Sequence, residues 1–268
     1  MRRLVPLVLV GLLTAGTGCD VVASQPAAVR AAAPQQALDD ALDRMAGADA
    51  LAYRLAIERD DVTVYRVDGT LALDQHAAEG VVSGTDADGF TDATPGRFVD
   101  DTLYLFIPAA VENPTSDCWV ELGARSAEVG LSLEGFGFNS LDVLRRVRVT
   151  AQEGTGALVG RIALDQAVLL AAFVLGEEAA ARVDSVTGDV AVRVTLSGGV
   201  VDHWDIDGDD FSEALAGSLP GSVVRTVPPF DTFSLRYDES EPVIVEPVPR
   251  DDVFDPALPG CPSRGIGA

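Results

Sequence analysis

The chain has 268 residues, with 42 acidic and 19 basic side chains and a formal net charge of −23 at pH 7. A chain this acidic is a poor match for nucleic acid, because that binding depends on many Lys or Arg contacts to phosphates. The sequence also contains no lysine, which excludes Schiff-base enzymes, Walker A nucleotide sites and Ser-x-x-Lys hydrolases, since each needs an ε-amine.

The N-terminus has the pattern of a bacterial lipoprotein signal. Two arginines precede an apolar run over residues 4–13, and small residues then lead to Cys19. This order is typical of a secretory signal, and the run is shorter than the ~20 apolar residues that span a membrane. We expect residues 1–18 to be removed and Cys19 to receive a lipid that anchors the protein to the outer face of the cell membrane. Ordinary secretion, with cleavage near Ala23, is the alternative.

The mature chain would be more acidic still. Residues 1–18 hold two arginines and no acid, so their removal changes the net charge from −23 to −25. Such a body gains no attraction to anionic headgroups, where each basic residue contributes about 1 kcal/mol. Contact with the cytoplasmic membrane is therefore expected through the acyl anchor alone. The charge is equally consistent with a solubility adaptation, which says nothing about mechanism.

Two cysteines remain after Cys19, namely Cys118 and Cys261. Outside the cytoplasm two thiols are expected to pair. A disulfide across so long a loop stabilises a fold by roughly 4–5 kcal/mol in the loop-entropy model. It would hold the Pro-rich tail against the strand that contains Trp119. There is no CxxC and no Cys/His cluster, so neither a metal site nor a cofactor is predicted.

The body of the chain is expected to begin after a tether at 19–33, which is rich in small and polar residues. Pro34 suits a first helical position, and a helix is predicted from there until Gly47. Its apolar face repeats at helical spacing through Leu38, Leu42 and Met45.

The pattern then changes from helical spacing to alternation of apolar and polar residues. Turn residues such as those at 60–61, 86–89 and 100–101 separate the alternating segments. This arrangement predicts an antiparallel meander with one apolar face. The predicted strands are 51–58, 62–74, 80–85 and 102–108.

The second half mixes helices with further strands. A helical or irregular stretch is expected over 124–146, and a largely apolar helix over 165–178, capped by Asp165. Helices and strands in this order indicate an α+β fold with one long antiparallel sheet and helices on one side. The domain is expected to span 34–250, followed by a Pro- and Asp-rich tail at 251–268. The predicted strands here are 147–152, 157–164, 188–196, 200–206, 232–237 and 242–248.

Several short motifs follow one another in a characteristic order, at 53–55, 99–108, 119–122, 141–144, 192–206 and 241–247. Their order resembles the LppX/LprG family of bacterial lipid-binding lipoproteins. Asp101 stands where that family usually has Gly, and the tail with Cys261 is an extension the family does not require.

The resemblance implies a curved antiparallel sheet, a half-barrel of the LolA/LppX type, with helices packed on its concave face around an apolar cavity. It also implies a lipid or acylated glycolipid as ligand, carried or presented in the cell envelope, with an envelope transporter as a possible partner and no enzymatic activity. The aliphatic and aromatic residues proposed to line the cavity are Leu55, Ile57, Leu71, Leu73, Leu103, Leu105, Phe136, Phe138, Leu169, Ala172 and Phe173.

Other interpretations of these residues stay open. The same apolar side chains would equally form a solid core, as in any domain. An envelope protein of this shape that binds protein partners through a sheet edge or its convex face is the alternative function. A hydrolase using His203 is a third, although no Gly-x-Ser-x-Gly elbow is present.

The segment 203–210 also invites a metal interpretation, because it is rich in aspartates around Gly208. Aligned on that glycine, an EF-hand loop would begin at His203 and end at Ala214, and neither residue supplies the acidic ligand those positions need. A β-turn after a strand is the expectation for this segment.

Overall fold

The computed structural model describes residues 27–85, 91–107, 118–121, 136–171, 185–224 and 229–253. The expected signal at 1–18, Cys19 and Cys261 lie outside these residues. The lipid anchor and the pairing of Cys118 with Cys261 therefore stay predictions.

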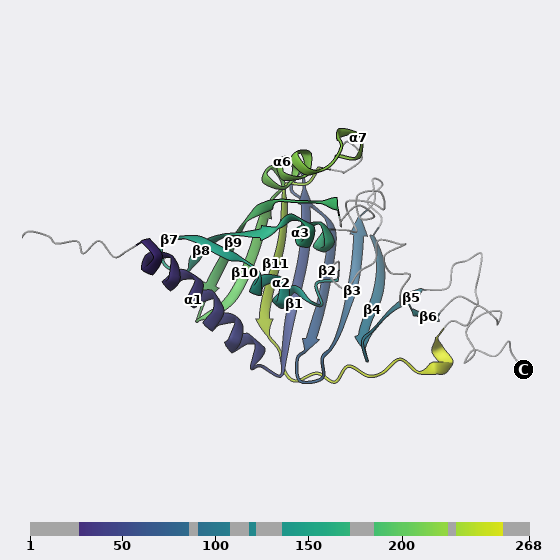
Figure 1. Cartoon of the computed structure of the whole chain (residues 1–268). Helices are drawn as coiled ribbons and strands as arrows, with labels where there is room; N and C mark the ends of the chain where they lie inside the picture. The colour runs from purple at the N-terminus through teal and green to yellow at the C-terminus, as the bar shows by residue number, and fades with distance from the viewer. Residues whose placement is uncertain are drawn as a thin grey trace, which may run out of the picture.

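A single sheet of eleven antiparallel strands forms the main layer, in the order β6-β5-β4-β3-β2-β1-β11-β10-β9-β8-β7 (Figure 1). The last strand pairs with the first, so two meanders join at the centre of one sheet. The strands are β1 (Ala50–Arg59), β2 (Val62–Ala72), β3 (Ala77–Thr85), β4 (Thr91–Val99), β5 (Thr102–Ile107), β6 (Cys118–Glu121), β7 (Arg148–Glu153), β8 (Ala157–Ala163), β9 (Asp189–Ser197), β10 (Val200–Asp207) and β11 (Thr232–Glu239).

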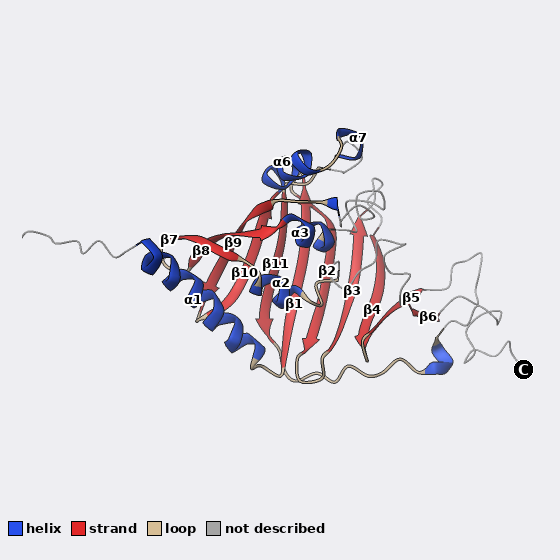
Figure 2. Ribbon diagram, in the orientation of Figure 1, coloured by secondary structure: helices blue, strands red, loops and turns tan. Residues whose placement is uncertain are grey.

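Helices gather on one side of this sheet and at one end of its strands (Figure 2). The long helix α1 (Ala27–Ala46) lies across the β7 to β10 half and contacts β7 and β10. The predicted α+β class with one antiparallel sheet is confirmed. The remaining helices are α2 (Ser140–Arg145), α3 (Leu164–Leu170), α6 (Gly208–Ser218), α7 (Gly221–Val224) and the 3₁₀ turn η3 (Arg250–Asp252).

Within these described ranges, no helix combines the length and the apolar character needed to cross a membrane.

Two helix starts differ from the sequence prediction. Helix α1 begins at Ala27, not at Pro34, so part of the expected tether at 19–33 is helical. Alanine, the best helix former, dominates this stretch, and Pro34 lies inside the helix. Helix α3 begins at Leu164 with Ala163 as its N-cap and no side-chain cap, so Asp165 lies in the first turn instead.

Three further elements also differ from expectation. Strand β4 was not predicted, because Pro95 and Gly96 are residues that sheets normally avoid. The expected strand at 242–248 is unpaired chain. The expected turn after β10 is the start of α6, whose N-cap Asp207 accepts hydrogen bonds from the amides of Asp209 and Asp210.

A row of glycines lets aromatic rings lie directly on the sheet. Tyr53, Gly69, Gly80 and Gly96 are paired in register across β1 to β4. A Cβ on Gly69 would come within 2.6 Å of the Tyr53 ring, and one on Gly96 within 2.8 Å of Phe136 Cζ. The Tyr53 hydroxyl donates a hydrogen bond of 2.7 Å to the Phe136 carbonyl. The space above the middle of these strands is therefore filled by the protein's own rings.

Beyond β11, residues 240–253 form a segment, here called the strap, which is extended as far as the 3₁₀ turn η3 and passes the turn ends of β2 to β5 (Figure 1). The Gln75 side chain donates to the Val243 carbonyl at 2.8 Å and accepts from the Val245 amide at 3.2 Å. Val245 is buried in a small cluster with Ala72, Ala77 and Val99. At its far end Val253 forms a parallel bridge with Trp119 of β6. The strap thus brings the C-terminal part of the chain beside Cys118.

The opposite edge of the sheet is covered by helix α1. The Gln35 side chain accepts a hydrogen bond of 2.9 Å from the Val149 amide and donates one of 3.3 Å to the Val147 carbonyl. A side chain of the helix therefore forms hydrogen bonds with the backbone at the start of the edge strand β7.

Candidate functional site

An apolar pocket of about 440 Å³ lies where the ends of β2, β3 and β4 meet helix α2 and the C-terminus of α1. Its floor is the inner face of the sheet, and its roof is the face of α2 and the turn before it. The apolar lining consists of Ala46, Leu71, Ala72, Leu73, Ala77, Ala78, Phe98, Phe138 and Leu141. This space is called the inner pocket below.

The structure brings only part of the predicted lining set to the inner pocket. Leu71, Leu73 and Phe138 line it. Leu169 is half-buried on α3, and Ala172 and Phe173 lie outside the described residues. The others belong to the packed core, each 5 % exposed or less: Leu55, Ile57, Leu103, Leu105 and Phe136.

Several lining residues were missed by sequence analysis. Phe98 lies on the unpredicted strand β4, and it reaches the pocket because it faces inward two residues after Gly96. Its ring packs 6.5 Å from that of Phe138, between ring centroids. The alternation of Gly96 and Phe98 was a usable signal, but Pro95 obscured it.

The mouth of the inner pocket is polar. His76 lies on the β2–β3 turn, and Asp142 and Arg145 lie one turn apart on α2. Arg145 Nη1 lies 2.9 Å from Asp43 Oδ1 of α1, so this ion pair ties the two helices together beside the pocket.

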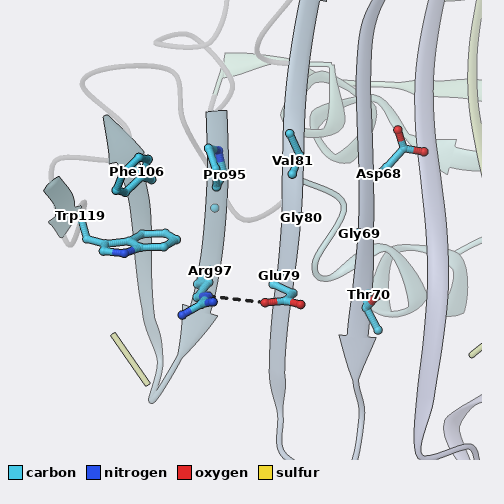
Figure 3. A pocket seen from close by; sticks show the side chains of 11 residues that line it. Asp68, Gly69, Thr70, Glu79, Gly80, Val81, Pro95, Arg97, Phe106 and Trp119 are labelled. Atoms are coloured by element: carbon cyan, nitrogen blue, oxygen red, sulfur yellow. Dashed lines mark ion pairs between the residues drawn. The ribbon is translucent and has the colours of Figure 1, made fainter. Parts of the chain in front are cut away.

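A second, larger depression of about 660 Å³ lies on the outer face of the same strands (Figure 3). It is called the outer groove. Val81, Pro95, Phe106 and Trp119 form one side, a row set by the strand register. Thr70, Glu79 and Arg97 form the other side. The backbone of Gly69, Gly80 and Gly96 forms the floor between the two rows.

Contacts within the outer groove fix its aromatic end. The Trp119 ring lies between Phe106 and Arg97 (Figure 3), with ring centroids 5.4 Å apart for the aromatic pair and the Arg97 guanidinium carbon 5.1 Å from the indole centroid. Arg97 Nε lies 3.5 Å from Glu79 Oε2, and Arg97 also donates to the Glu246 carbonyl of the strap. Arg97 thus contacts both the groove and the strap.

Two aspartates of the outer face, Asp68 and Asp205, have pKa values shifted in opposite directions. Partial burial acts to raise the pKa of Asp68, but hydrogen bonds from Arg66 and Arg54 outweigh it and hold that pKa below its ordinary value. Burial raises the pKa of Asp205, against the smaller opposing influence of His203 and Arg193.

Among the described residues, no hydroxyl or thiol nucleophile lies within normal hydrogen-bond distance of His203. Its Nδ1 lies 3.1 Å from Asp202 Oδ2, but its Nε2 is 3.8 Å from Asp205 Oδ1 and 3.5 Å from Thr195 Oγ1. A nucleophile must lie within normal hydrogen-bond reach of its base, and 3.5 Å is beyond the usual range for an oxygen donor. Asp207 caps α6, and within the described part of the chain no group of three His, Cys, Asp or Glu is placed to hold a metal ion.

Comparison with solved structures returns two mycobacterial proteins at low sequence identity. LprF from Mycobacterium bovis is 10% identical over 81% of this chain and 98% of its own, with a TM-score of 0.44. The Mycobacterium tuberculosis lipoprotein LppX is 18% identical over 80% of this chain and 99% of its own, with a TM-score of 0.43. The resemblance noted in the sequence was to the LppX/LprG family of lipoproteins. No protein-family model and no curated protein matches the chain.

Proposed function

We propose that the protein is an extracytoplasmic lipoprotein that binds a lipid or another hydrophobic ligand in the inner pocket and carries or presents it in the cell envelope. The observation that carries this proposal is the lining of that pocket, which is mostly aliphatic and aromatic and opens beside a polar mouth. An apolar hollow with a few polar groups at one end suits a molecule with an apolar chain and a polar head.

The volume of the inner pocket and the free energy of burying apolar groups in it support a small ligand with a single acyl chain. A volume of about 440 Å³ lies within the usual range of about 300–1,000 Å³ for small-molecule sites. Each methylene buried there contributes about 0.8 kcal/mol, so a single acyl chain gains affinity without specific polar contacts. The filled space around Tyr53 and Phe136 argues against a large hollow under the middle of the sheet.

The N-terminal sequence supports the location. A signal-like segment over 1–18 followed by Cys19 would place an acyl anchor ahead of helix α1. The cytoplasmic membrane is then both the site of attachment and the nearest source of lipid or acylated glycolipid. An envelope transporter that accepts the ligand belongs to the same proposal.

Native mass spectrometry of the full protein, purified from its own membrane, tests this function. We expect a co-purifying lipid on the wild-type protein. Leu73→Trp, which places a large ring in the inner pocket, should reduce the lipid-bound fraction severalfold. Leu196→Trp makes the same change at a half-buried position on β9, away from the pocket, and should retain the lipid. Equal loss in both variants, or no lipid on any form, would refute the proposal.

A protein partner in the outer groove is a second candidate function, favoured by the side formed by Phe106, Trp119, Pro95 and Val81, of which Val81 is 40% exposed. Aromatic residues in a shallow groove are typical of interaction surfaces. A protein that co-purifies with the wild type and is lost in Trp119→Ala, while Leu73→Trp keeps it, would favour this function over lipid binding.

A further inference from the structure

The charges around the mouth of the inner pocket limit which head group it accepts. Arg145 is the one basic side chain among its described lining residues. An arginine beside an apolar pocket would ordinarily suit the carboxylate of a fatty acid, because its guanidinium matches that group. In this protein, however, Arg145 is paired with Asp43, and Asp142 lines the same pocket.

Asp43 holds Arg145 from α1 at 2.9 Å, and Asp142 lines the same pocket one turn earlier on α2. With His76 counted as neutral, these three charged side chains leave a net charge of −1 at the mouth. The C-terminal end of the 20-residue helix α1, at Ala46, adds the partial negative charge of a helix C-terminus. The chain as a whole carries −23, which extends the same repulsion to longer range.

We infer that the inner pocket selects a single-chain amphiphile with an uncharged polar head, such as a monoacylglycerol, over an anionic one of the same chain length. This inference rests on the proposed function and adds the chemical class of the ligand. Hydroxyl groups of a neutral head can accept from Arg145 and donate to Asp142 together, whereas a carboxylate can only accept. The carboxylate would also meet the two aspartates at close range.

A matched pair of ligands tests the inference on the full protein, freed of bound lipid. Monolauroylglycerol and laurate share one chain length and differ in head charge, and their affinities at pH 7.5 are compared by displacement of a fluorescent fatty-chain probe below their micellar concentrations. We expect laurate to bind at least about fivefold more weakly, the ratio given by one unit charge at contact distance in water. The ratio should shrink in about 1 M salt, because screening then acts over about 3 Å.

Variants separate the mouth charges from the charge of the whole chain. Asp142→Asn should strengthen laurate binding severalfold and bring the ratio of the two affinities closer to one. Asp209→Asn removes the same charge from an exposed position on α6, at the other end of the strands (Figure 1), and should leave the ratio as in the wild type.

Three outcomes decide the matter. Laurate that binds wild type as tightly as monolauroylglycerol overturns the inference while leaving lipid binding intact. An Asp142→Asn variant that gains affinity for both ligands alike also overturns it, because the aspartate then acts by occupying space. Failure of both ligands to bind refutes the proposed function itself.

Discussion

Gly96 on β4 and the ring of Phe136 are packed so closely that a Cβ on the glycine would come within 2.8 Å of Phe136 Cζ and nearer still to Cε1. Phe136 is fully buried and its carbonyl accepts the Tyr53 hydroxyl. The sheet and the segment leading into α2 are therefore joined through one position where no side chain fits.

Gly96→Ala should destabilise the protein by about 1–3 kcal/mol, the usual range for forcing an extra carbon into a packed core. Gly84→Ala on β3 is the control, because its nearest neighbour would be the Val64 carbonyl at 4.0 Å. Denaturant unfolding measures both. Equal free energies of unfolding for the two variants would contradict the packing described, and Phe136→Leu combined with Gly96→Ala should recover part of the loss.

Gln75→Ala should release the strap without unfolding the sheet. The variant loses the hydrogen bonds to Val243 and Val245, each with a net value of about 0.5–1.5 kcal/mol. Hydrogen exchange of the amides at 243–246 should become faster by about tenfold or more. Gln152→Ala is the comparison, since that side chain bonds the nearby Gly154 carbonyl within its own turn. Unchanged exchange in Gln75→Ala would show that burial of Val245 alone holds the strap.

Asp68 and Asp205 should affect stability with opposite dependence on pH. The pKa of Asp68 is lower in the folded protein, so its stabilising effect is present above the unfolded pKa and is lost as the pH falls through the folded one. The pKa of Asp205 is raised, so its contribution is present below the unfolded pKa and is lost as the pH rises through the folded one.

Asp68→Asn should therefore lower stability at pH 7 but not in acid, and Asp205→Asn should raise it at pH 7 but not in acid. Each effect should stay below about 1 kcal/mol, because both sites are partly exposed and screened by solvent. Thermal unfolding from pH 3 to 8 measures them. The same sign for both variants at pH 7 would contradict the assignment.

Asp207→Ala should cost about 0.5–2 kcal/mol, because Asp207 caps α6 by accepting from the amides of Asp209 and Asp210. Asp207→Asn should retain most of the stability. Millimolar calcium should leave the melting temperature of the wild type unchanged if these aspartates serve the helix. A clear rise in the melting temperature with calcium that is lost in Asp207→Ala would favour the metal interpretation.

The pairing of Cys118 with Cys261 predicts a mass increase of about two hydrogens on reduction of the mature protein. Cys118 is buried at the start of β6, next to the residue that bridges Val253 of the strap. Cys118→Ser should lower stability by up to about 4–5 kcal/mol in the loop-entropy model, and Cys261→Ser by a similar amount. Free thiols on both residues in the unreduced protein would overturn the pairing.

Much of the fold could be predicted from the sequence, because strict alternation of apolar and polar residues indicates a β-strand with one buried face. In β1, Tyr53, Leu55 and Ile57 face the core while Arg54 faces solvent, and the same pattern fixed most other strands. It failed at β4, where Pro95 is paired with Val81 of β3 inside the sheet, although proline is normally confined to edge strands, strand starts and bulges. A single strand gives no sign that its neighbours tolerate a proline.

The site was harder to predict, because residues that line the pocket and residues that fill the core show the same alternation of inward-facing apolar side chains. Leu55 and Leu71 both alternate inward, yet Phe136 and its neighbours fill the space over Leu55, while the end of β2 extends past them toward α2. Which inward residue meets empty space depends on where the helices stop. Helix α6 is a different case, because the sequence contains the signals of a helix start that the expected β-turn overlooked. These are the cap at Asp207, the acidic first turn and the apolar pair Phe211 and Leu215.

The Gln35 contacts at β7 and the Val253 bridge at β6 have a joint consequence for behaviour at high concentration. An open sheet normally exposes two rows of backbone groups that can recruit strands from other molecules, the first step toward fibrils. Here the Gln35 side chain binds part of the free backbone row at β7, and the strap binds part of the row at β6. At high concentration, copies of this protein would therefore have little opportunity to extend one another's sheets.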